Sequence, residues 1–168
     1  VKLPSITDET VLISAEGFEE RSRELDSLRT EARRELGERL REARLDGDLD
    51  DNPALQDLLE EKEHLERRIA LLEDRLALAE IVPPAADGRA GIGSVVRVRD
   101  ADGATFEYEL VGPLEADAVN GRVSIAAPVG QALVGQRAGA SVEPVTPRGR
   151  LGLKVVAVRP RQSARKAA

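Results

Sequence analysis

Apolar residues recur in steps of three, four or seven along residues 15–45, a stretch without proline. They are Phe18, Leu25, Leu28, Ala32, Leu36, Leu40 and Ala43. Residues three, four and seven apart share one face of an α-helix, so this pattern predicts a single long amphipathic helix.

A second apolar series, in residues 53–80, alternates between steps of three and four. Its positions are Leu55, Leu58, Lys62, Leu65, Ile69, Leu72, Leu76 and Ala79, so one lysine interrupts a heptad seam. Residues 46–52 between the two series are too short to let the second helix run anywhere but back along the first. The chain is therefore expected to form an antiparallel coiled-coil hairpin, about 45 Å long, that projects into solvent or into a partner's cavity.

The pattern changes after residue 80. Prolines at 83 and 84 end the helical pattern, and residues 81–92 are interpreted as a linker. Short alternating or β-branched runs then follow, at 95–98, 106–111, 122–125, 142–145 and 151–158. These runs predict a compact antiparallel sheet within residues 93–159, with a brief helix at 128–134. The basic segment 160–168 is expected to be disordered.

The predicted fold class is therefore α+β, with a helical hairpin domain at residues 11–80 followed by a β domain. The two halves differ in charge. Residues 1–80 carry 13 Lys and Arg against 23 Asp and Glu, net −10, whereas residues 81–168 carry 12 against 8, net +4. The halves thus meet different electrostatic demands.

Composition narrows the function classes. With no cysteine the chain has no thiol nucleophile and no cysteine-ligated metal, and a reducing cytoplasm is the expected location. One Tyr and two Phe are too few for the stacking surface of a single-strand nucleic-acid binder. No signal peptide is expected, because the N-terminus has no basic flank followed by an apolar run. No membrane span is expected, because no run of about 18 apolar residues occurs.

Several strings of the sequence resemble one protein family. The segment Ile13-Ser14-Ala15-Glu16-Gly17-Phe18, the approach Arg41-Glu42-Ala43-Arg44 to Gly47-Asp48-Leu49, and residues 110–117 and 123–135 are similar to bacterial Gre transcription elongation factors. Gly139, Val142-Glu143 and Thr146-Pro147-x-Gly149 also match, so the resemblance covers about residues 11–158.

The resemblance implies a fold and a role. The second domain is expected to be FKBP-like and to dock on bacterial RNA polymerase, while the hairpin enters the secondary channel and stimulates cleavage of backtracked RNA at its 3′ end. The protein would act as a monomer. It would not be an enzyme and would have no cofactor of its own, because the Mg²⁺ belongs to the polymerase active site.

The expected chemistry lies at the hairpin tip, Gly47-Asp48-Leu49-Asp50-Asp51-Asn52. The resemblance assigns Asp48 as a ligand of the polymerase's second Mg²⁺, which prefers oxygen ligands and retains waters. Asp51 stands where the family has Glu, which helps to hold the metal or activate the attacking water. It is one methylene shorter, and catalytic groups lose much of their power over about 1 Å.

Other tip residues are expected to modulate this chemistry. Asp46 and Asp50 add carboxylates whose mutual repulsion favours cation binding or raises pKa values. Asn52 precedes Pro53 at the start of the second helix, and Leu55 replaces the family's Tyr, which affects how RNA is positioned. The docking contacts implied by the resemblance are Ala126, Ala127, Pro128 and Gly130.

Simpler interpretations stand beside these. The Asp and Asn residues around the turn could be helix caps alone, and the series Asp46, Asp48, Asp50 partly resembles a calcium loop with a misplaced glycine. His64, the only histidine, is expected to be an exposed helical residue, and Lys62 either fixes the register or contacts RNA or polymerase.

Three functions therefore remain open from the sequence. The first is a cleavage-stimulating elongation factor. The second is a non-catalytic Gre-like paralogue that occupies the same channel and inhibits or modulates transcription, which the substitutions at Asp50, Asp51 and Leu55 favour. The third is a coiled-coil adaptor unrelated to polymerase.

Overall fold

The computed structural model describes residues 10–45, 52–85, 87–147 and 149–161. The chain divides into two compact units. One is the hairpin, residues 19–78, and the other combines residues 1–18 with residues 79–168. The predicted hairpin domain began at residue 11, so this grouping moves the chain's first described residues into the sheet unit.

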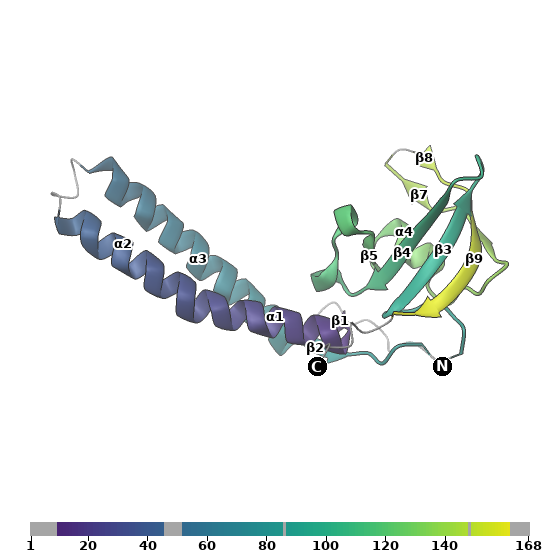
Figure 1. Cartoon of the computed structure of the whole chain (residues 1–168), viewed down its shortest axis with the longest axis horizontal. Coiled ribbons are helices and arrows are strands. Elements are labelled where there is room, and N and C mark those ends of the chain that lie inside the picture. Colours follow the sequence, from purple (N-terminus) through teal and green to yellow (C-terminus); the bar gives the residue numbers. More distant parts are fainter. Residues whose placement is uncertain (1–9, 46–51, 86, 148, 162–168) are drawn as a thin grey trace, which may run out of the picture. The chain divides into compact units, whose positions relative to one another are not determined.

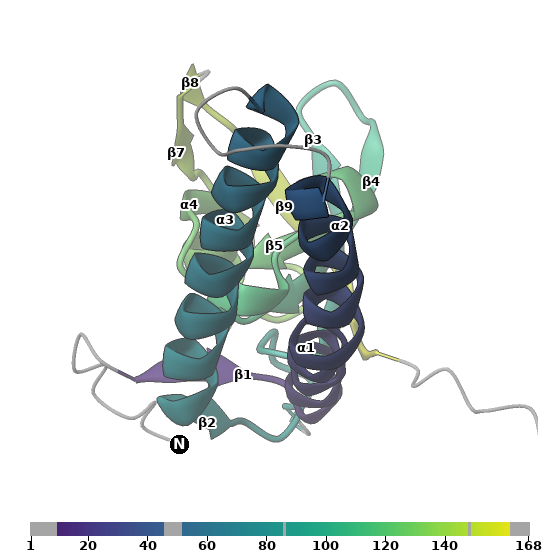
Figure 2. The same ribbon diagram turned by 90° about the vertical axis from the view of Figure 1, so that its left-hand side faces the viewer.

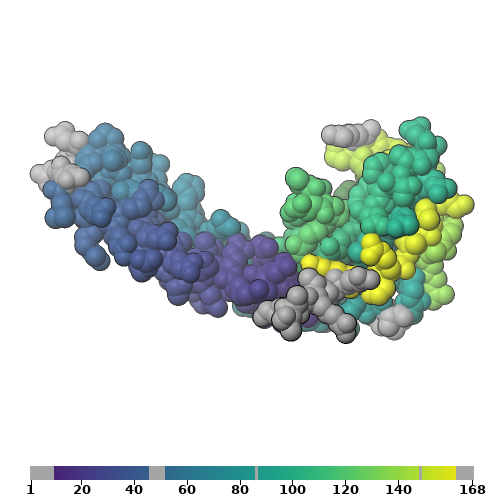
Figure 3. Space-filling view, viewed as in Figure 1, coloured from purple at the N-terminus to yellow at the C-terminus, as the bar shows by residue number. Residues whose placement is uncertain are grey.

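The hairpin consists of two antiparallel helical arms. The first contains α1 (Ala15–Ser27), a π-helical segment (Leu28–Ala32) and α2 (Arg33–Leu45), and the second is α3 (Pro53–Ala77). Figures 1 and 2 show α2 and α3 lying side by side, and the space-filling view shows them in contact along the arm (Figure 3). The predicted coiled-coil hairpin is thus confirmed.

The apolar seam forms the interior of the hairpin in two clusters. The cluster near the tip contains Leu36, Leu40, Leu55 and Leu58. The cluster at the end of the hairpin far from the tip contains Leu25, Ile69 and Leu72. Lys62, which occupies a seam position in the sequence, is exposed in the structure. Leucine burial therefore holds the arms together, while the lysine leaves the seam for solvent.

The first arm is not one continuous α-helix, because residues 28–32 form a π turn. Four residues of α-helix overshoot one turn by about 40°, so the successive steps of four at Leu28, Ala32, Leu36 and Leu40 drift around an ideal helix. A wider turn contains an extra residue and offsets part of this drift. The predicted single helix was wrong at this point for that reason.

The second arm ends three residues before the predicted residue 80. After α3, β2 (Ala79–Ile81) pairs in parallel with β1 (Val11–Ile13), in the register Val11↔Ala79 and Ile13↔Ile81. Ala79 fits the helical spacing, but strand pairing with a segment distant in the sequence overrides it. Neither strand was predicted.

The core of the second unit is a five-stranded sheet. Its strands are β3 (Ser94–Asp100), β4 (Thr105–Val111), β5 (Arg122–Ser124), β6 (Ser141–Val142) and β9 (Leu153–Pro160). Their order is β5-β4-β3-β9-β6. The β4–β5 pair is parallel and the others are antiparallel, so the sheet is mixed and the predicted all-antiparallel sheet was wrong at this pair. The α+β fold class is confirmed.

One face of this sheet carries the buried core. Val96, Val98, Leu110 and Val155 are at most 1% exposed, and Leu133 of α4 (Pro128–Leu133) packs against them. Ala90 belongs to the same core, and its N–H donates to the Gln136 carbonyl at 2.7 Å. The second part of the predicted linker 81–92 is therefore built into the sheet unit. The brief helix predicted at 128–134 is confirmed.

Two further details differ from the sequence prediction. Residues 142–145 are not one strand: Pro144 separates β6 from β7 (Val145–Thr146), which forms a small hairpin with β8 (Gly149–Arg150). Proline lacks the N–H that a continuous ladder requires. At the other end β9 reaches Pro160, so the predicted disordered tail 160–168 begins too early, and residues 162–168 lie outside the described residues. No helix in the described ranges is long and apolar enough to cross a membrane.

Candidate functional site

The four predicted tip acids, Asp46, Asp48, Asp50 and Asp51, lie outside the described residues. Their roles as metal ligands and water-activating groups therefore stay predictions. Among the residues that the structure describes, no group of three His, Cys, Asp or Glu side chains is placed to hold a metal ion. The structure does describe the residues that flank the tip, at the end of α2 and the start of α3, which together are called the base of the tip.

Asn52 lies at this base, as the residue that precedes α3. Its Oδ1 accepts from the Leu55 N–H at 3.1 Å, which caps the helix, and proline occupies the first helical position. Its Nδ2 donates to the Ala43 carbonyl of α2 at 3.0 Å. The predicted cap is confirmed, and the same side chain also joins the two arms.

Leu55 is 1% exposed and packs with Leu36, Leu40 and Leu58 inside the hairpin. It was predicted as a tip residue that affects RNA positioning. The side chain itself is part of the hairpin core, and the effect on RNA of its standing in place of the family's Tyr stays a prediction. The position lies one turn into α3, where the heptad seam faces the other arm.

A groove of about 360 Å³ lies between α2 and α3, next to this base. Leucines line its floor, and most of its polar lining is cationic. The lining residues are Arg33, Leu36, Gly37, Leu40, Arg41, Arg44, Lys62, Leu65 and Glu66. At Gly37 an added Cβ would have no heavy atom within 4 Å, so the missing side chain helps to keep the groove open.

Only one of the groove cations is paired with a described carboxylate. Arg33 reaches Glu66 through two hydrogen bonds, which raise the pKa of the guanidinium and lower that of the carboxyl. Arg41, Arg44 and Lys62 form no ion pair within the described part of the chain. The groove therefore has a net positive charge suited to an anionic ligand.

The sequence prediction overlooked these arginines. A signal was present, because positions 33, 37, 41 and 44 share one helical face in steps of four, four and three. The prediction did consider Lys62 as an RNA or polymerase contact, and the structure places it at this groove. His64 is exposed on α3, as predicted.

The predicted docking loop follows β5. The Ala126 N–H donates to Ser124 Oγ at 3.1 Å, and the Ala127 N–H donates to the Ser124 carbonyl at 3.0 Å. Ala126 and Pro128 are exposed, and Ala127 is half-buried. The loop is thus held by its own backbone with these two side chains available on the surface.

Gly130 has a different function from the rest of that loop. It is buried, and a Cβ there would lie 2.0 Å from the Ser124 carbonyl oxygen, far inside any permitted contact. Only glycine lets α4 approach β5 this closely. Gly130 is thus a packing requirement of the loop, and its contact with a partner stays a prediction.

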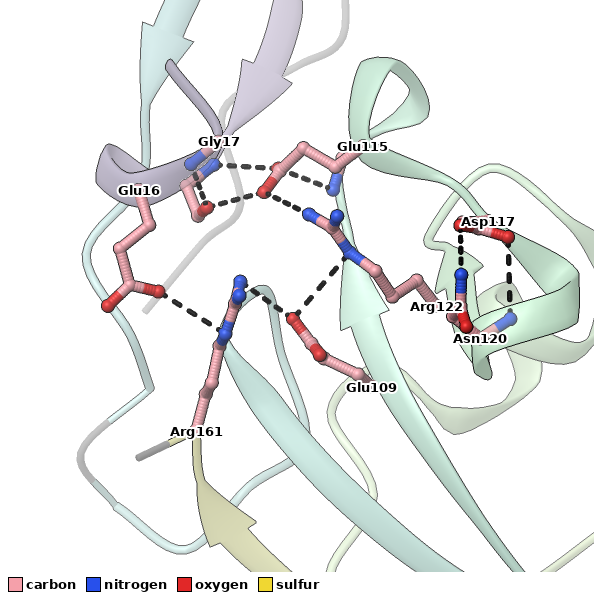
Figure 4. Close-up of polar contacts among 10 residues, drawn as sticks. Glu16, Gly17, Glu109, Glu115, Asp117, Asn120, Arg122 and Arg161 are labelled. Atoms are coloured by element: carbon pink, nitrogen blue, oxygen red, sulfur yellow. Dashed lines mark hydrogen bonds and ion pairs between the residues drawn. The ribbon is translucent and has the colours of Figure 1, made fainter. Parts of the chain in front are cut away.

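A buried carboxylate anchors the first turn of α1 in the sheet unit (Figure 4). The Glu115 carboxylate accepts from the Ser14 N–H at 2.9 Å, the Ser14 hydroxyl at 2.5 Å and the Gly112 N–H at 3.1 Å. Ser14 Oγ in turn accepts from the Gly17 N–H at 2.9 Å, which caps α1. Glu115 is 2% exposed, so this charge depends on its partners.

Four more charged residues extend the network. Arg122 lies 3.6 Å from Glu115, and Arg161 contacts both Glu109, at 2.8 Å, and Glu16 of α1, at 3.3 Å. The sequence prediction missed this network, although Ser14 and Glu115 both stand in strings that it quoted. A Cβ on Gly17 would lie 2.1 Å from the Glu115 side chain, so the helix start and the carboxylate are matched in shape.

Comparison with known protein families matches both parts of the chain. Residues 11–81 match the model described as "Transcription elongation factor, N-terminal", and residues 85–160 match "Transcription elongation factor, GreA/GreB, C-term". Together the two matches span nearly all of the described chain.

Similar individual proteins agree. The chain is 36% identical over 152 residues to "Transcription elongation factor GreA" of Syntrophobacter fumaroxidans, covering 89% of this chain and 97% of that protein. It is 36% identical over 137 residues to the protein of the same description from Novosphingobium aromaticivorans, covering 80% and 86%.

Among solved structures, the chain is similar to GreA factor homolog 1 (Gfh1) of Thermus thermophilus, at 32% identity and a TM-score of 0.42, covering 89% of this chain and 99% of that one. The family matches and the sequence relatives establish the assignment. The chain belongs to the GreA/GreB family of transcription elongation factors.

Proposed function

We propose that this protein binds bacterial RNA polymerase, inserts its hairpin tip into the secondary channel and stimulates cleavage of backtracked RNA by the polymerase active site. The polymerase is the catalyst, and this protein lends carboxylates to it as a monomer. The proposal rests on the family assignment and applies its chemistry to particular residues of this chain.

The observation that favours it most is the cationic groove beside the base of the tip. Arg41, Arg44 and Lys62 face a groove that ends within a few residues of the tip acids in the sequence. RNA phosphates attract such cations, and the contact requires no aromatic stacking. We therefore assign this groove to the 3′ segment of the backtracked RNA.

At the tip, Asp48 is assigned to the second Mg²⁺ of the polymerase and Asp51 to the metal or its water. Carboxylate oxygens are the ligands that Mg²⁺ prefers, and a second metal in phosphodiester cleavage stabilises the attacking and leaving oxygens. Asp46 and Asp50 add negative charge at the same turn. The metal would be held only in the complex, since this protein supplies part of its ligands.

Docking is assigned to the loop after β5. Ala126 and Pro128 are its exposed residues, and Ala127 is half-buried between them. Small side chains on a loop fixed by Ser124 offer a contact surface with little conformational entropy to lose on binding.

The test is RNA cleavage in a stalled, backtracked complex of the cognate polymerase. Asp48→Asn is expected to abolish stimulation while binding to core polymerase is retained, and Asp57→Asn is the matched control because it makes the same charge change on the exposed surface of α3. Equal loss of activity in both variants would mean that bulk charge, and not the tip site, supports cleavage.

A second function, inhibition of transcription from the same channel, is favoured by Leu55. The family's Tyr position is filled here by a fully buried side chain, so no aromatic ring is presented at that point. In this alternative the acidic tip occupies the channel without accelerating cleavage. Slowed nucleotide addition by bound protein, with no gain in cleavage, would establish it. The family assignment argues against the adaptor unrelated to polymerase.

A further inference from the structure

We propose that Asn52 is a positioning residue, which ties the two arms together at the base of the tip and so fixes where the tip acids stand. This inference rests on the proposed function for its catalytic consequence.

The tie uses both ends of one amide. Oδ1 accepts from the Leu55 N–H in the first turn of α3, and Nδ2 donates to the Ala43 carbonyl in the last turn of α2, nine residues earlier in the chain. Asn52 itself has φ −119° and ψ 85°, outside the helical region, so its side chain is free to reach across. A single planar group thus bridges two helices.

The Ala43 carbonyl lies in the last described turn of α2, where helix carbonyls depend on partners from outside the helix. Within the part of the chain that the structure describes, Asn52 is the donor that reaches it. Because the donor to the Ala43 carbonyl is the residue that caps α3, the end of α2 and the start of α3 are held by the same side chain.

A common helix cap does not explain the choice of residue. Ser, Thr and Asp cap helices about as well as Asn, because they need only an acceptor. Asp offers no donor, and it would place a carboxylate oxygen against the Ala43 carbonyl. Ser keeps an acceptor but is shorter. Asn alone among these residues supplies an acceptor to α3 and an amide donor to α2.

The Asn52 hydrogen bonds lie next to a well-packed part of the hairpin core. Leu55 is 1% exposed and Leu40 is 7% exposed, so the first turn of α3 is clamped on α2 directly below Asn52. Residues 46–51 connect two ends that are therefore held in place. Because catalytic groups lose about 100-fold over a displacement of roughly 1 Å, holding these ends is a direct contribution to activity.

The polymerase-independent test uses the absence of native cysteine. Spin labels on Glu42→Cys and Asp57→Cys, both exposed, report the separation of the two arms beside the tip. We expect one narrow distance distribution in this labelled protein and a broadened or longer one after Asn52→Asp or Asn52→Ser. An unchanged distribution in both variants would overturn the tie.

The functional test separates positioning from stability. Asn52→Asp is expected to bind core polymerase within about two-fold of the parent protein but to lower the cleavage rate at saturating factor by about ten-fold or more, with more Mg²⁺ needed for half-maximal rate. The control, Ile69→Val, loosens the hairpin core away from the tip. Equal effects of the two variants on the cleavage rate would reduce Asn52 to a stability role.

The two failures are distinguishable. If the unmodified protein does not stimulate cleavage, the proposed function fails, and the spin-label distances still decide whether Asn52 joins the arms. If it stimulates cleavage and Asn52→Asp does so equally at every Mg²⁺ concentration, the positioning role fails while the proposed function stands.

Discussion

Replacing Glu115 with Gln tests the anchor of the α1 first turn with almost no change in shape. The carboxylate accepts three hydrogen bonds and faces Arg122 at 3.6 Å. The oxygen of a Gln side chain can still accept from the Ser14 and Gly112 N–H groups. Its NH₂ group then stands where the Ser14 hydroxyl needs an acceptor, and it faces the Arg122 guanidinium.

The expected cost follows from these contacts. A hydrogen bond to a charged group contributes about 1.5–3 kcal/mol, and removing one partner of a buried ion pair costs about 3–5 kcal/mol. Since two of the three bonds survive in neutral form, we expect about 3 kcal/mol of destabilisation for the sheet unit. For a domain of this size that corresponds to a decrease in Tm of at least about 10 °C.

The assay can follow each unit separately. Tyr108 is the only tyrosine and no tryptophan is present, so tyrosine fluorescence reports the sheet unit, while the helical circular-dichroism signal is dominated by the hairpin. The matched control is Glu107→Gln, the same change at an exposed carboxylate paired with two arginines, and little change in Tm is expected. A decrease for Glu115→Gln no larger than that of the control would refute the reasoning.

Three further predictions concern the docking loop, the groove and acid stability. Gly130→Ala should destabilise the sheet unit strongly and weaken polymerase binding, because its Cβ would lie 2.0 Å from a backbone oxygen, and tyrosine fluorescence during melting checks this. Arg41→Ala should weaken cleavage stimulation several-fold, more so at higher salt, whereas Arg75→Ala, which removes an exposed arginine near the other end of α3, should not, and a salt titration of the cleavage rate decides. The Arg33–Glu66 pair lowers the pKa of the glutamate below 4.5, so its contribution to the hairpin is present above that pH and lost as pH falls through the folded value. The Tm of the hairpin, followed by the helical circular-dichroism signal, should therefore change less between pH 7 and pH 3 in Glu66→Gln than in the parent protein.

The hairpin was predictable from sequence because its forces are local and periodic. The leucine seam repeats every three or four residues, and each repeat faces the same partner helix. The same reasoning failed where a distant segment decided the outcome. Ala79 continues the seam, yet it pairs with Val11, which lies far away in the sequence.

The candidate site was only partly predictable for the same physical reason. Glu115 and Ser14 are separated by 101 positions, and nothing local in either segment indicates that the carboxylate is buried. Gly130 gave no sign that a carbonyl oxygen fills the space of its missing side chain. Leu55 was assigned to the tip by its position after the turn, whereas the heptad series that contains it was the better guide to its burial.

The central claim is tested most directly by the length of the transcript in a stalled, backtracked polymerase complex incubated with Mg²⁺, with and without this protein at saturating concentration. The account predicts faster shortening of the RNA with the protein present, and a rate near the unstimulated one with Asp48→Asn. Unchanged shortening together with slower nucleotide addition, in a complex shown to contain the protein, would contradict cleavage stimulation and identify an inhibitor of the same channel.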